Sequence, residues 1–183
     1  MEALVEKAMK DGAYGLATGL IYVPGTYSNT EEVVGLAKVA ARYGGVYASH
    51  IRYEGDEVLT AIEEAVNIGR QAAIPVQISH FKVSGQNNWG RSKETIAAVE
   101  NARREGIDVT IDQYPYTASS TGLNTLLPSW ALAGGLDSIK ARVNDPTTRQ
   151  RMVKEMVATL KRRKQSHFTY AVVAYYDADT TLN

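Results

Sequence analysis

Two short runs decide the fold: Val46-Tyr47-Ala48-Ser49-His50 and, about thirty residues later, Val76-Gln77-Ile78-Ser79-His80. Both runs are rich in the residue types that favour β-strands, and both end in histidine. Between them, residues 56–72 place apolar side chains at helical spacing. Because parallel strands must be joined by a crossover segment, this strand–helix–strand order predicts an α/β protein with a parallel sheet.

The same unit continues on both sides of this stretch. Residues 14–21 form an earlier strand-like run before a helical stretch, and residues 108–112 form a later one. Helical sequence then extends to about residue 164, and residues 168–174 (FTYAVVA) have the composition of a fifth strand. Equivalent points in the four successive units are held by Thr18, His50, His80 and Asp112.

We expect an incomplete (β/α)8 barrel with about four βα units and a fifth strand, in one partial domain spanning residues 1–183. A complete barrel typically needs about 250 residues, and the chain has 183. The alternative is an open doubly wound sheet. It would fit the length, but the first strand is not followed by Gly-x-Gly-x-x-Gly, and no phosphate-binding loop of the Gly-Lys-Ser type occurs.

Composition limits the classes of binding partner that we expect. Twenty basic residues balance twenty acidic ones, so charge gives no reason to expect nucleic acid or an anionic membrane as a partner. The first residues, Met1 to Lys7, suggest an amphipathic helix rather than a secretion signal, and no apolar run approaches membrane-spanning length. We therefore expect a cytoplasmic protein. The chain has no cysteine, which excludes thiolate metal ligands.

The two histidines at strand ends are candidate metal ligands. In a parallel barrel the carboxyl ends of the strands meet at the mouth, where catalytic groups gather, and neutral imidazole is a good zinc ligand. The other interpretation is that His50 and His80 are only hydrogen-bonded groups at strand ends. His167 precedes the expected fifth strand, at the opposite end of a unit, and we interpret it as a solvated loop residue.

Four motifs in register resemble the N-acyl-D-amino-acid deacylases, or D-aminoacylases, of the amidohydrolase superfamily. The resemblance extends from about Asp11 to Asn183 and corresponds to the middle of that family's catalytic domain. The family's activity is metal-dependent hydrolysis of the amide bond of an N-acyl-D-amino acid. The motifs are Gly19-Leu20-Ile21-Tyr22-Val23-Pro24-Gly25, His50-Ile51-Arg52-Tyr53-Glu54-Gly55-Asp56, Gln77-Ile78-Ser79-His80-Phe81-Lys82 and Asp112-Gln113-Tyr114-Pro115-Tyr116.

The resemblance implies roles for individual residues. His50 and His80 match two zinc ligands. Lys82 and Tyr114 match residues that contact the substrate, and Tyr22 falls in a loop near the substrate side-chain pocket. Lys82 could equally be a solvated lysine at the rim. Glu54 and Asp56 are candidates for orienting a metal ligand, although Asp56 is more simply a helix cap.

The resemblance also implies a site that is partial in this chain. The family has an early His-x-His pair, a metal-binding cysteine and a late aspartate that acts as general base. This sequence has neither of the first two, and Asp177 and Asp179 do not match the third. We therefore assign no catalytic residue here and expect weak or partial zinc binding.

Three hypotheses remain. The chain is the central part of a working deacylase, a non-catalytic piece that keeps the fold, or an interaction module. A half-barrel leaves strand edges exposed, which favours a homodimer or larger homo-oligomer. The expected inward, poorly covered face of the sheet includes Val76, Ile78, Val109 and Ile111.

Overall fold

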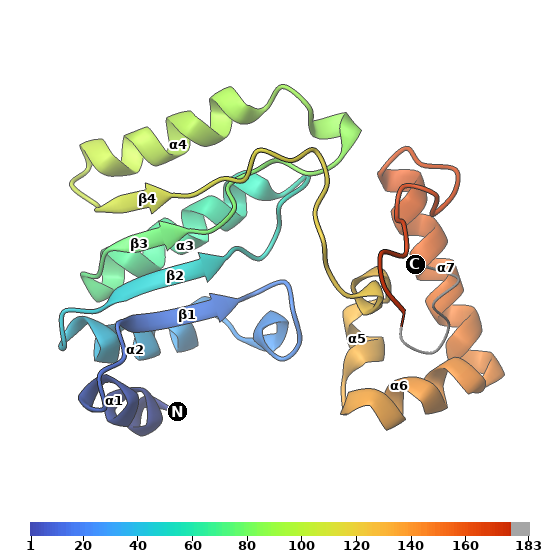
Figure 1. Cartoon of the computed structure of the whole chain (residues 1–183), viewed down its shortest axis with the longest axis horizontal. Helices are drawn as coiled ribbons and strands as arrows, with labels where there is room; N and C mark the ends of the chain where they lie inside the picture. Colours follow the sequence, from blue (N-terminus) through green and yellow to red (C-terminus); the bar gives the residue numbers. More distant parts are fainter. Residues whose placement is uncertain (177–183) are drawn as a thin grey trace.

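The structure, a computed structural model, describes residues 1–176. Its centre is one parallel sheet with strand order β1-β2-β3-β4 (Figure 1). The strands are β1 (Gly15–Gly19), β2 (Val46–His50), β3 (Val76–Ile78) and β4 (Val109–Ile111). Neighbours in the sheet are neighbours in sequence, and each is reached through a crossover helix, as in a barrel. The predicted α/β fold with four βα units is confirmed.

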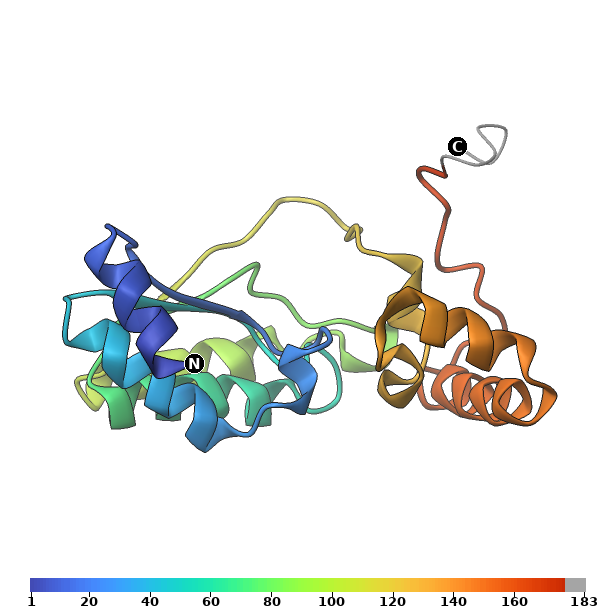
Figure 2. The same cartoon turned by 90° about the horizontal axis from the view of Figure 1, so that it is seen from below.

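Helices cover one face of this sheet. Helices α2 (Thr30–Ala41), α3 (Val58–Ala72) and α4 (Ser92–Arg104) lie side by side beneath the strands (Figure 2). Helix α1 (Glu2–Lys10) packs against α2. The other face carries no helix in the part of the chain that the structure describes. No described helix is both long and apolar enough to cross a membrane.

The apolar strand residues face the helices, not the open side. Val76, Ile78 and Val109 are at most 1% exposed and belong to the core formed with α2, α3 and α4. Because side chains alternate along a strand, Gln77 takes the opposite face, where it is aligned with Ala48 and Thr110. Our expectation of a poorly covered inward face is wrong for Val76, Ile78 and Val109, because the helices pack against them. Ile111, the fourth residue of that expectation, is 39% exposed.

Close packing of α3 on β3 depends on Gly69. A methyl group there would overlap Cγ2 of Val76. We expect Gly69→Ala to lower the free energy of unfolding by about 1–2 kcal/mol, because overpacking outweighs the gain in helix propensity. The matched control is Gly35→Ala in α2, where the added methyl would meet only the flexible Glu2 side chain. Urea unfolding of both variants checks this, and equal stabilisation of the two would contradict it.

Beyond β4 the chain forms a helical group at the carboxyl ends of the strands (Figure 1). Its helices are α5 (Ser129–Leu132), α6 (Gly135–Asn144) and α7 (Pro146–Arg162). Short 3-10 helices occur at Gly25–Tyr27, Gln86–Asn88 and Leu123–Leu126. The hydroxyl of Tyr27, in the loop after β1, donates to the carbonyl of Ser129 at 2.7 Å. This bond joins the helical group to the sheet.

The predicted fifth strand at residues 168–174 is wrong. This segment has no strand structure, and it follows α7 in the helical group rather than pairing with β4 (Figure 1). A strand needs a neighbour to satisfy its backbone groups, and α5, α6 and α7 separate this segment from the sheet in sequence. Val172 remains 85% exposed. Asp177 and Asp179 lie outside the described residues.

Candidate metal centre

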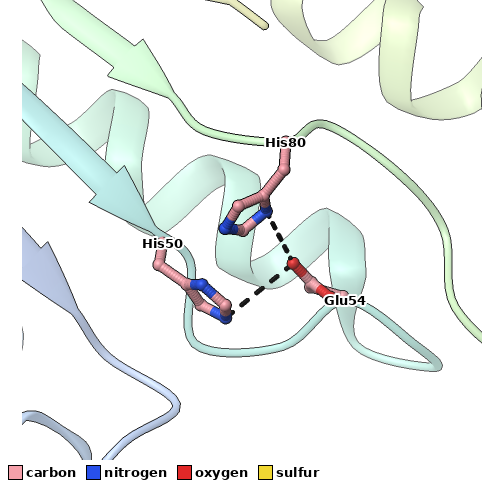
Figure 3. A group of neighbouring side chains, drawn as sticks. All are labelled: His50, Glu54 and His80. Atoms are coloured by element: carbon pink, nitrogen blue, oxygen red, sulfur yellow. Dashed lines mark ion pairs between the residues drawn. The ribbon is translucent and has the colours of Figure 1, made fainter. Parts of the chain in front are cut away.

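The two histidines converge at the carboxyl edge of the sheet (Figure 3). His50 is the last residue of β2, and His80 follows β3 by two residues. Their ring centroids are 4.3 Å apart with an interplanar angle of 71°. Because His50 alternates with the buried Ser49, its side chain belongs to the helix-free face of the sheet. The parallel register therefore brings together two side chains thirty residues apart.

Glu54, in the loop after β2, adds a third donor. Its Oε1 lies 3.0 Å from Nδ1 of His80 and 3.8 Å from Nε2 of His50 (Figure 3). Ligand atoms around tetrahedral zinc, with bonds of about 2.1 Å, stand roughly 3.4 Å apart. The His50, Glu54 and His80 donors all lie within 4.8 Å of one another. The sequence indicated only a supporting role for Glu54, whereas the geometry places it among the donors.

The state of His50 also fits a metal. Its Nε2 is buried yet has no hydrogen-bond partner among the described residues. Burial lowers the pKa of His50 below its usual value; Glu54 opposes this shift, and His80 and Lys82 add to it. Burial therefore favours the neutral imidazole, the form whose lone pair can bind a cation. A buried imidazole nitrogen without a hydrogen-bond partner, beside a carboxylate, is a donor set that zinc accepts.

The other residues expected at the site are also here. Lys82 Nζ lies 2.6 Å from Oε1 of Glu54 and 3.1 Å from Nδ1 of His80. The Tyr114 ring centroid is 5.4 Å from the same ammonium. The Tyr22 ring stands 4.7 Å from that of His50. The structure thus brings together residues from four successive units of the chain.

Asp112, to which we had assigned no role, holds the backbone of His80. The His80 N–H donates to Oδ1 of Asp112 at 2.5 Å, and Gln77 donates to Oδ2 at 2.8 Å. His80 has φ = 42°, a conformation that is rare for residues other than glycine. Such a conformation persists only where its surroundings enforce it, and the Asp112 carboxylate does so here. The signal in the sequence was the position of Asp112, equivalent to the two histidines.

Removing the Asp112 carboxylate is expected to weaken metal binding. In Asp112→Ala the His80 backbone loses its acceptor, and zinc affinity should fall by a factor of about 10–100, as for other groups that orient ligands. The control is Asp108→Ala, at the opposite end of the same strand, where the side chain is exposed. Calorimetric titration with zinc measures the zinc affinity of both variants. Equal affinities in the two variants would rule out the orienting role.

We had expected Asp56 to cap a helix, and this expectation is wrong. Helix α3 begins at Val58, and the Asp56 carboxylate instead accepts hydrogen bonds from Asn87 and Asn88 at 3.1 and 2.7 Å. These bonds attach the loop after β3 to the loop that carries Glu54. Trp89, in the loop after β3, is 74% exposed. Asp56 therefore stabilises the two loops that border the candidate metal centre.

The ion pair between Arg52 and Glu64, which we call the arginine clamp, holds the loop after β1. The Arg52 guanidinium pairs with Glu64 at 2.9 Å and donates to the carbonyls of Thr26 and Ser28 at 3.2 and 3.0 Å. Arg52 and Glu64 are both largely buried, so the pair is well shielded from water. This clamp connects α3 to the loop that contains Tyr22.

Comparison with known proteins agrees with this geometry. No family model matches the chain. A D-aminoacylase of Alcaligenes xylosoxydans xylosoxydans is 46% identical over 123 residues, which are 67% of this chain and 25% of that protein. An N-acyl-D-glutamate deacylase of the same organism is 44% identical over 121 residues, or 66% of this chain and 25% of that protein. The match is shorter than the nearly complete resemblance expected from the motifs.

Solved structures show the same relationship. A crystal structure of D-aminoacylase, described as defining a novel subset of amidohydrolases, superposes with a TM-score of 0.62 at 45% identity. It covers 64% of this chain and 25% of that one. The N-acyl-D-glutamate deacylase of Bordetella bronchiseptica, in complex with zinc and a phosphonate inhibitor, gives 0.61 at 42% identity, covering 63% and 24%.

The chain spans about a quarter of the length of these relatives. Within the matched region, both identity above 40% and superposition support common descent. Over about two thirds of its length, this chain therefore belongs to the N-acyl-D-amino-acid deacylase family of amidohydrolases.

Proposed function

We propose that this chain supplies part of the active site of a zinc-dependent enzyme that hydrolyses N-acyl-D-amino acids, and that it is inactive when isolated. The observation that carries this proposal is the convergence of His50, Glu54 and His80 at the carboxyl edge of the sheet. That edge is where the catalytic residues of barrel enzymes gather. Residues 1–183 would form one partial barrel domain, and a cytoplasmic location stays a prediction.

Each residue then has a distinct task. Zinc, when bound, would polarise the amide carbonyl and make a bound water more acidic. His50 and His80, with Glu54 beside them, would hold the ion. Lys82 would bind the substrate carboxylate through its ammonium, and the Tyr114 ring beside it would border the amide. We assign no catalytic acid or base to this chain.

A segment exchange tests this proposal. The 123 matched residues would replace the corresponding stretch of the Alcaligenes D-aminoacylase. We expect the hybrid to release free amino acid from N-acetyl-D-amino acids, because the recipient contributes the remaining groups. His80→Ala in the hybrid should abolish turnover, and a circular dichroism spectrum that matches the unsubstituted hybrid checks that this variant is folded. A folded hybrid with no activity would contradict the proposed function.

A second proposal concerns self-association. Strands β1 and β4 are the edges of the sheet, and its other face lacks a helical cover among residues 1–176. Unpaired edges invite pairing with another chain. We infer that the chain forms a homodimer or larger homo-oligomer. In this alternative to the enzymatic role, the chain acts as a non-catalytic assembly module. The unpaired edges carry this inference.

Light scattering at micromolar concentration should therefore give a mass of at least two chains. Ala17→Lys places a charge on the exposed face of β1 and should shift the protein towards monomer, because charged residues oppose edge pairing. Ala13→Lys is the matched control, exposed but before the strand. A wild-type chain that remains monomeric and melts cooperatively would rule out the assembly.

A further inference from the structure

We propose that the Lys82 ammonium and the metal ion compete for the same two atoms, so that metal binding releases Lys82 to bind an anionic substrate. This inference rests on the proposed metal centre and adds an order of events to it. Metal binds first, and the substrate carboxylate follows.

The first step of the argument is shared occupancy. Lys82 Nζ donates to Oε1 of Glu54 at 2.6 Å and lies 3.1 Å from Nδ1 of His80. Glu54 and His80 also belong to the candidate metal centre. Their atoms Oε1 and Nδ1 face each other at 3.0 Å, and we take these two atoms as the ligand atoms of the pair. The lone pair of Nδ1 can accept a hydrogen from the ammonium or bind a cation, but not both. Two cations at one carboxylate oxygen would also repel each other strongly in a site shielded from water.

The second step is that Lys82 has somewhere else to go. Its side chain is 20% exposed, so the ammonium lies at the boundary of the site rather than deep inside it. The Tyr114 ring centroid is 5.4 Å from Nζ, within the range of a cation–π contact. A lysine displaced from Glu54 thus stays next to Tyr114, where a carboxylate from the substrate would meet it.

The third step is reciprocity. If metal displaces Lys82 from Glu54, then any carboxylate that holds Lys82 away raises metal affinity by the same factor. Metal loading and recognition of the substrate carboxylate would therefore support each other. The ion pair between Lys82 and Glu54 by itself opposes metal binding at Glu54 and carboxylate binding at Lys82, because each event must first break the pair.

Calorimetric zinc titration of the whole chain tests the competition. Lys82→Met should raise zinc affinity about tenfold, within the range typical of coupled sites. The control is Lys154→Met, an exposed lysine on α7, which should leave the affinity unchanged. If Lys82→Met binds zinc no more tightly than wild type, the competition is overturned while the metal centre stands. If neither protein binds zinc, the proposed metal centre itself is wrong.

Amine labelling of the wild-type chain provides a measurement that needs no substitution at Lys82. Brief acetylation followed by mass spectrometry should show labelling of Lys82 rising several-fold when zinc is added, with Lys154 unchanged. The rise should be absent in the His50→Ala/His80→Ala variant. Zinc binding without any change at Lys82 would overturn the inference, because the ammonium would then have kept its place.

Discussion

Zinc binding is expected to fall by more than about a hundredfold in the double variant His50→Ala/His80→Ala, exceeding the effect of losing a group that merely orients a ligand. The wild-type chain should bind at most one zinc ion, and weakly, because the sequence has no cysteine and no His-x-His pair. Removing both imidazoles leaves Glu54 as the one protein donor of the candidate centre. A single carboxylate does not hold zinc firmly.

Metal analysis after dialysis measures this effect directly. His167→Ala is the matched control, because it removes the third histidine, which is exposed and follows α7. It should retain the zinc content of the wild type. Two zinc ions held tightly per chain would show that further ligands exist, and unchanged binding in the double variant would remove the histidines from the metal centre.

The second large effect is the absence of turnover. We expect the isolated chain, with zinc added, to release no measurable amino acid from N-acetyl-D-amino acids. A general base typically contributes a factor of about 100 to 10,000, and we assign none to this chain. The metal would also lack the His-x-His pair and the cysteine that the resemblance to the family leads us to expect, because this sequence contains neither.

A sensitive assay for free amino acid checks this expectation, with the hybrid enzyme as positive control. Turnover by the isolated chain that disappears in His80→Ala would make this a shortened enzyme. Turnover that survives His80→Ala would indicate a contaminating hydrolase. The contrast between the inactive chain and the active hybrid would locate the missing groups in the rest of the relative.

Much of the architecture follows from local sequence patterns. The run from Val46 to His50 became β2 with the expected limits, because its alternation matches a half-buried strand. Helical spacing between residues 56 and 72 likewise predicted α3 to within two residues. The same argument failed at residues 168–174, whose composition favours a strand. A strand forms only where a neighbour can pair with it, and composition does not contain that information.

The histidine pair was also accessible from the sequence, since parallel strands of similar length bring equivalent residues to one edge. Side-chain roles were less accessible. The sequence indicated that Glu54 supports the site, but not that its carboxylate contacts both His80 and Lys82. Nor did it show that Asp112 stabilises the positive φ of His80. Both depend on the paths of loops after the strands.

Sequence alone thus determined the repeating βα units and the family, and it named candidate residues for the site, because periodicity and motif spacing are local properties. Tertiary structure decided which face of the sheet is buried, since Val76 could face either side until α3 packed against it. It also decided that Glu54, His80 and Lys82 share one small volume. Contacts among residues that are distant in the chain arise from the register of the strands and the paths of the loops, and distance along the sequence does not specify either.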